Sequence, residues 1–205
     1  FHYVTALGMV TLLLFVDFNT ISPGANDNLT GTYAAVCALR MLDMAGIDFE
    51  NTEVCAMITD GEEAGLRGCK QWAKDHYDEY VNSGVETAVL CVDTLADLEY
   101  LRVYNKDMTG TVKNSQQFSQ LVMDSAKDSG HNDLEFSSVY FGSSDAAAFS
   151  QAGITATCLA AMDPKPADYY HNRRDTAERL VPEAIKTGFD VIISTILNFD
   201  EKGLN

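Results

Sequence analysis

Apolar residues occur along the chain in two kinds of pattern. Short continuous apolar runs bounded by turn-forming residues are typical of buried strands, whereas apolar residues three or four positions apart are typical of amphipathic helices. The runs predict strands at 9–16, 52–59, 85–92, 134–140 and 155–161, and a further strand at 98–104 that we place at an edge of the sheet. The spacing predicts helices at 32–45, 69–81, 115–129, 144–151 and 182–199.

Strands and helices alternate from one end of the chain to the other. This order predicts an α/β fold of three layers, α/β/α, in which a central, mostly parallel sheet carries helices on both faces. The 205 residues suit a single domain spanning 1–205, since no internal repeat or linker-like segment interrupts them. Because the first residue is Phe1 rather than Met, we expect the chain to be a fragment or a processed product without its N-terminal portion.

Charge and cysteine content narrow the possible partners and compartments. A formal net charge of −16 argues against binding to nucleic acid or to an anionic membrane, which requires Lys and Arg patches. Five cysteines form no CxxC pair, so we expect no disulfide framework, and a reducing compartment such as the cytoplasm is favoured. Secretion stays open, because we expect the N-terminal portion of the chain to be missing. No apolar run reaches transmembrane length, and no basic residue precedes the run at 9–16, which we therefore interpret as a strand rather than a signal segment.

Acidic side chains follow the predicted strands at the points where the strands end. The carboxyl ends of parallel strands meet at one edge of a sheet, where open α/β folds bind their ligands. Taken singly, each acid could be a helix N-cap. Gathered together, carboxylates repel one another unless a cation joins them, and Asp, Glu and His together suit zinc or a similar divalent ion. The residues expected to converge are Asp27, Glu62, Glu63, Asp93 and His171.

The adjacent acids Glu62 and Glu63 can point in different directions from a turn. One can then bind the metal while the other faces the water that the metal activates and carries its proton to the leaving group. This division of roles predicts a metal-dependent hydrolase.

Five motifs occur in a fixed order along the chain. They read SPGANDNLTG (22–31), DGEEAGLRG (60–68), VDT (92–94), SSD with a Phe four residues on (143–149), and YHNRRDT (170–176). Together they resemble the zinc aminopeptidase family of co-catalytic metallo-exopeptidases. This family includes bacterial leucyl aminopeptidase and aminopeptidase Y, with glutamate carboxypeptidases and glutaminyl cyclases as relatives. The resemblance extends over residues 9–198.

The resemblance implies a zinc-exopeptidase domain with two co-catalytic zinc ions, acting on the N-terminal bond of a peptide or aminoacyl substrate. Asp27 would bridge the two metals, and Asp93 with His171 would complete the first site. Glu63 would hold the second metal, and Glu62 would be the general base. Family members also have a cis peptide after the bridging Asp, which here is the Asp27–Asn28 bond.

One family position is not matched. The family carries a His two residues before an Asp at the end of its first strand. Counting back from Pro23 aligns Asp17 with that Asp and places Phe15 at the His position, whereas the alternative register places Asp17 at the His and Asn19 at the Asp. In either register the second site lacks its imidazole, so we expect it to bind metal weakly or to stay empty. Asp17, which would orient the missing His, is left without that partner.

Other side chains admit two interpretations. Asp145 would brace the site from behind the ligands; Tyr170 would either wall the substrate pocket or pack in the core. Arg173 would either grip a substrate carboxylate or pair locally with Asp175.

Two further functions stay open, a mono-zinc acyltransferase of the glutaminyl cyclase type and a non-catalytic homologue that serves as a binding module. Side-chain specificity depends on variable loops, and neither it nor the oligomeric state follows from the sequence.

Overall fold

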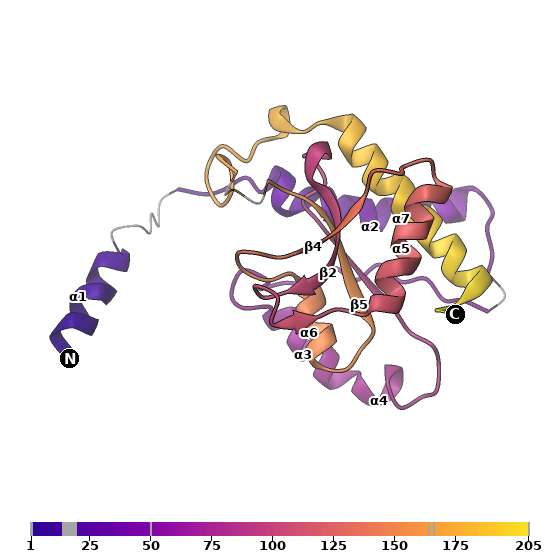
Figure 1. Cartoon of the computed structure of the whole chain (residues 1–205), viewed down its shortest axis with the longest axis horizontal. Helices are drawn as coiled ribbons and strands as arrows, with labels where there is room; N and C mark the ends of the chain where they lie inside the picture. Colours follow the sequence, from indigo (N-terminus) through magenta and orange to yellow (C-terminus); the bar gives the residue numbers. More distant parts are fainter. Residues whose placement is uncertain (1, 14–19, 50, 164, 166, 205) are drawn as a thin grey trace.

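The computed structural model describes the chain except for residues 1, 14–19, 50, 164, 166 and 205 (Figure 1). Its strands are β1 (Val89–Asp93), β2 (Leu101–Asp107), β3 (Val112–Lys113), β4 (Glu135–Ser138) and β5 (Ala156–Ala161). Its α-helices are α1 (His2–Leu13), α2 (Gly31–Met44), α3 (Arg67–Asp75), α4 (Tyr77–Tyr80), α5 (Gln116–Asp128), α6 (Asp145–Gln151) and α7 (Pro182–Lys202). A short helical turn, η1 (Ala25–Thr30), precedes α2.

The five strands form one mixed sheet. Its order is β1-β5-β2-β3, and β4 pairs with β2 as well. The pairs β1–β5 and β2–β4 are parallel, whereas β2–β5 and β2–β3 are antiparallel. Since β2 has strands around it, the edge position that we expected for 98–104 is wrong. The reason is apolar burial, because Leu101 and Val103 are at most 2% exposed and require cover from both neighbouring strands and helices.

Two hydrophobic clusters cover the two faces of the sheet. Successive side chains of β5 point to opposite faces and so belong to different clusters. Leu159 and Ala161 pack with α2, α5 and α7 on one face. Cys158 and Ala160, whose side chains point the other way, pack with α3 and α6. All six residues of β5 are buried, as expected for a strand with helices on both sides (Figure 1). The three-layer α/β/α architecture is therefore confirmed.

Several helices begin or end where the sequence predicts. Ser115 caps α5 by accepting a hydrogen bond from the Phe118 amide at 3.2 Å, and Pro182 occupies the first turn of α7. Gly46 follows α2 with a φ of +66°, the left-handed conformation of a C′ glycine. The helix predicted at 69–81 is divided, because the backbone at His76 leaves the helical region and separates α3 from α4.

Two predicted strands are not strands. The described part of 9–16 belongs to α1, which projects from the body of the molecule with Met9 66% exposed (Figure 1). The segment 52–59 has no regular secondary structure and pairs with no described strand. A strand needs a neighbour to satisfy its backbone groups, whereas a helix satisfies its own, and apolar sequence alone does not supply that neighbour.

Among the described residues, no helix combines the length and the apolar character needed to cross a membrane. All five cysteines are free thiols, in agreement with the expectation of no disulfide framework.

Candidate metal centre

The loop that carries Asp27 is held in place by a buried acid from the other end of the chain. Asp175 is 1% exposed, and its two carboxylate oxygens accept hydrogen bonds from the amides of Asn26 and Asp27 at 2.8 and 2.9 Å. From the sequence, Asp175 is expected only as a local ion-pair partner of Arg173, and the described residues show no such pair. The available signal was its place in the YHNRRDT motif, four residues after His171, which brings both residues to the same loop.

Asn28 joins this loop to the end of β1. The side-chain nitrogen Nδ2 of Asn28 donates to the Val92 carbonyl at 2.9 Å. The side-chain oxygen Oδ1 accepts from the backbone amide of Thr94 at 3.2 Å. These two bonds flank Asp93, so the backbones that carry Asp27 and Asp93 are tied together. The Asp27–Asn28 peptide is cis, as the family resemblance implies.

A tight turn presents Glu62 and Glu63. The amides of Gly65 and Leu66 both donate to the Glu62 carbonyl, at 2.9 and 2.7 Å, and the Arg67 amide donates to the Gly61 carbonyl at 3.0 Å. The turn runs directly into α3. Because its amides are satisfied internally, the two acidic side chains project from a closed turn rather than from an open loop.

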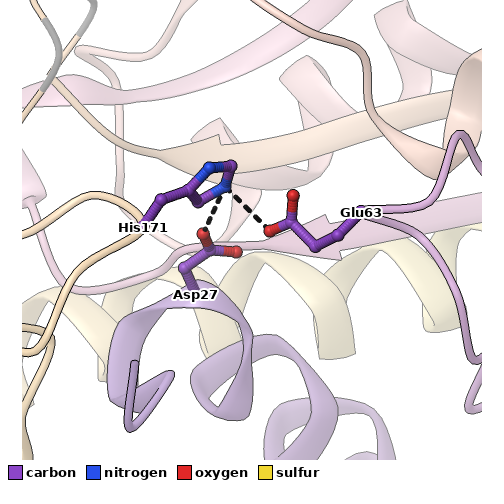
Figure 2. A group of neighbouring side chains, drawn as sticks. All are labelled: Asp27, Glu63 and His171. Atoms are coloured by element: carbon purple, nitrogen blue, oxygen red, sulfur yellow. Dashed lines mark ion pairs between the residues drawn. The ribbon is translucent and has the colours of Figure 1, made fainter. Parts of the chain in front are cut away.

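Asp27, Glu63 and His171 meet at one point (Figure 2). Nε2 of His171 lies 3.3 Å from Oδ2 of Asp27 and 2.8 Å from Oε1 of Glu63. One potential ligand atom from each residue lies within 4.8 Å of the other two. Hydrogen bonds to Asp27 and then to Glu63 raise the pKa of His171 to about 10. A metal at this point would replace the shared proton on Nε2, since a metal-binding imidazole is neutral.

The ring of Tyr170 supports the His171 imidazole. The two rings are stacked with centroids 3.7 Å apart and planes 26° apart. Tyr170 also lines the adjoining cavity. Its neighbour Tyr169 is buried instead, accepts a hydrogen bond from Nδ2 of Asn26 and donates one to Asp97. Tyr170 therefore faces the site, whereas Tyr169 packs beneath it.

A cavity of about 90 Å³ adjoins this point, and several acidic side chains line it. Asp27, Glu62, Glu63 and Asp93 all line it. Burial, and then the charge of Asp27, raise the pKa of Asp93 well above its usual value. Burial, and then the charge of Glu63, raise the pKa of Glu62 to about 7. The carboxylates thus repel one another, which is the electrostatic setting that a cation relieves.

The donor set fits a divalent metal. Carboxylate oxygens and an imidazole nitrogen are zinc ligands, and three of them already face one point. In addition, the Oδ1 atoms of Asp93 and Asp145 are buried and accept no hydrogen bond from any described residue. Buried carboxylate oxygens are almost always satisfied, so Asp93, which lines the cavity, has an oxygen free to accept a bond from a metal or a donor.

The remaining candidates divide into those near the site and those away from it. Oδ2 of Asp145 accepts a hydrogen bond from the Thr59 hydroxyl at 2.9 Å, and Asp145 adds to the negative charge felt by Glu62. Arg173 is exposed and forms no ion pair with a described residue. Phe15 and Asp17 lie outside the described residues, so the register of the first motif stays a prediction.

Comparison with known proteins adds three findings. The sequence model described as peptidase family M28 matches residues 10–196. Aminopeptidase YwaD of Bacillus subtilis (strain 168) is 28% identical over 198 residues, which are 88% of this chain and 38% of YwaD. Among solved structures, LapB from Legionella pneumophila superposes with a TM-score of 0.74 at 16% identity, over 93% of this chain and 50% of LapB.

A second structure, described as the zinc aminopeptidase BSAP from Bacillus subtilis, superposes with a TM-score of 0.62 at 22% identity. The alignment covers 85% of this chain and 42% of BSAP. At these identities both structures establish the shared fold. The chain spans between about a third and a half of the length of the proteins that it matches here.

Proposed function

Because the chain belongs to peptidase family M28, we propose that it forms the catalytic domain of a zinc-dependent aminopeptidase. The reaction is hydrolysis of the N-terminal bond of a peptide or aminoacyl substrate. The observation that carries this proposal is the meeting of Asp27, Glu63 and His171 at one point beside the cavity that Glu62 lines.

Asp27, Glu63 and His171 would hold the metal, and Asp93 would join them from the end of β1. The first three present their ligand atoms to one another, and Asp93 has a buried oxygen with no donor. Zinc bound there would polarise the scissile carbonyl and lower the pKa of a water molecule toward about 7. BSAP, with the same fold, is described as a zinc enzyme.

Glu62 is the general base. Its carboxylate removes a proton as the water oxygen attacks the scissile carbonyl, and returns that proton to the departing amine when the C–N bond breaks. Glu62 is suited to this role because it lines the cavity and is not one of the three converging side chains. The closed turn holds Glu62 next to Glu63 in the sequence, while only Glu63 reaches the point where Asp27 and His171 meet.

The acidic lining of the cavity favours a substrate with a free α-amine. One zinc ion offsets only two of the negative charges that four ionised carboxylates carry, so an N-terminal ammonium is still attracted there, whereas a substrate carboxylate is repelled. This electrostatic preference favours removal of N-terminal rather than C-terminal residues.

Metal analysis combined with hydrolysis of aminoacyl p-nitroanilides in zinc, cobalt or manganese tests the proposal. We expect Glu62→Gln to lower kcat by a factor of about 100 to 10,000 while metal content is kept, because only the proton carrier is lost. The exposed Glu201→Gln is the matched control and should leave kcat unchanged. Metal binding without turnover in all three metals would instead identify a binding module, and cyclisation of an N-terminal Gln substrate would identify an acyltransferase.

The second metal site is proposed to be impaired because Phe15 stands where the family carries His. Phe15→His should then raise the number of metal ions per chain and increase kcat. Atomic absorption on the purified variant measures the first quantity. If the variant binds metal at the Asp27 site as the wild type does but takes up no additional metal, the register that places Phe15 at the His position is wrong.

A further inference from the structure

The turn that carries Glu62 and Glu63 is approached by a segment with little backbone support. Residues 52–59 belong to no strand, and no hydrogen bond between their backbone and the sheet is found among the described residues. Of the side-chain hydrogen bonds found there, only that from Thr59 to Asp145 leaves the segment. The position of the turn therefore depends on how its ends are held.

Asp145 holds the chain just before this turn. Its Oδ2 accepts from the Thr59 hydroxyl at 2.9 Å, three residues before Glu62. On the other side of the turn the chain continues into α3, where Cys69 is 1% exposed. Asp145 begins α6, whose next four residues are at most 2% exposed in the core, so it is anchored on a rigid element.

We infer that Asp145 is a positioning residue that fastens the start of the Glu62–Glu63 turn to the core through Thr59. The inference rests on the proposed function for its catalytic consequence, since Glu62 and Glu63 serve as base and ligand there. Asp145 does not line the cavity, and substitutions of Thr59 test its action through the turn while its charge near Glu62 is kept.

Removing the contact should loosen the turn without unfolding the core. Thr59→Val keeps the shape of the side chain and removes the hydroxyl, whereas Thr59→Ser keeps the hydroxyl and is the conservative rescue. Thr157→Val is the matched control, because the buried Thr157 hydroxyl is bonded to Ser119 at 2.7 Å, away from the turn. Asp145→Ala removes the acceptor of the same hydrogen bond.

Hydrogen exchange of the amides of Gly65, Leu66 and Arg67 in chelator measures the order of the turn without any turnover. We expect exchange at least tenfold faster in Thr59→Val and Asp145→Ala, and wild-type exchange in Thr59→Ser and Thr157→Val. Zinc affinity should fall by a factor of about 10 to 100 in the first two variants, as for other residues that orient a ligand.

Kinetics separate the inference from the proposed function. With aminoacyl p-nitroanilides, kcat should fall in Thr59→Val while KM changes little, because the base moves and the rest of the cavity does not. Wild-type exchange and zinc affinity in both Thr59→Val and Asp145→Ala would overturn the inference, whatever the activity. Faster exchange and weaker zinc binding in a protein without turnover would support the inference and reject the proposed function.

Discussion

Asp175 shows how much of the site depends on one residue outside the ligand set. Its carboxylate is buried and accepts two backbone amides, one of them from Asp27 itself. Hydrogen bonds from backbone amides to a buried carboxylate are among the stronger ones in proteins, and the loss of the acceptor leaves both amides unsatisfied.

Asp175→Ala should therefore lower the free energy of unfolding by about 3 kcal/mol. Urea denaturation measures the change, and zinc affinity should fall in parallel because the Asp27 loop is released. The control is Asp168→Ala, which removes an exposed ion pair with Arg179 and should cost about 0.5 kcal/mol or less. Equal effects of the two substitutions would show that Asp175 does not hold the loop.

His171 is the residue that links the two acids of Figure 2. Its left-handed backbone, with a φ of +55°, and the stacked ring of Tyr170 orient Nε2 toward Asp27 and Glu63. The acids come from a loop before α2 and a turn before α3, so only the fold places them beside this imidazole.

At the scale of elements, the site depends on the close contact between the start of α2 and the end of β1. A Cβ atom on Gly31 would lie 2.2 Å from the Val92 carbonyl oxygen and 2.4 Å from the side-chain oxygen of Asn28. No side chain fits there, so glycine is what allows α2 to approach the strand that carries Asp93.

Gly31→Ala should accordingly destabilise the fold by about 3 kcal/mol, because a backbone carbonyl cannot move aside without shifting β1. Gly8→Ala in α1 is the matched control, since nothing lies within 4 Å of its added Cβ, and alanine there favours the helix. Thermal denaturation compares the two. A Gly31→Ala protein as stable as the wild type would contradict the close contact.

The two strand predictions that failed show the limit of reasoning from single elements. The apolar run at 52–59 predicts a buried strand, yet the segment has no ladder partner among the described strands. At 9–16 the apolar residues are compatible with a helix as well. Local pattern decides which face of a segment is apolar, whereas pairing depends on what lies beside it.

At the scale of the molecule, a protein whose net charge is −16 gathers Asp27, Glu62, Glu63 and Asp93 around one cavity. A bound cation both joins the acids and stabilises the fold by binding the native state alone.

Zinc added to chelator-treated protein should therefore raise the melting temperature. At a concentration about 100 times the Kd, the gain is about 2.7 kcal/mol, which corresponds to about 5–10 °C for a chain of this size. Differential scanning fluorimetry measures the shift. His171→Ala should abolish it, and His76→Ala, which alters an exposed pair with Glu79, should keep it. A shift that survives His171→Ala would place the zinc elsewhere.

The sequence alone determined the layered α/β architecture and the points where its acids fall. Alternation of apolar runs with amphipathic segments shows the order of strands and helices, and Asp27, Glu62, Glu63, Asp93 and His171 could be identified because each follows a predicted strand or lies in a motif. The family resemblance supplied their expected roles, which remain predictions.

Only the tertiary structure decided which of these residues touch and what holds them there. The bonds of the buried Asp175 to the Asp27 loop, the two bonds of Asn28 on either side of Asp93, and the bond of Thr59 to Asp145 all join residues distant in sequence. Such contacts carry no local pattern, because a polar side chain looks the same in the sequence whether water or a buried amide is its partner. They form only when packing of the sheet and helices removes the water.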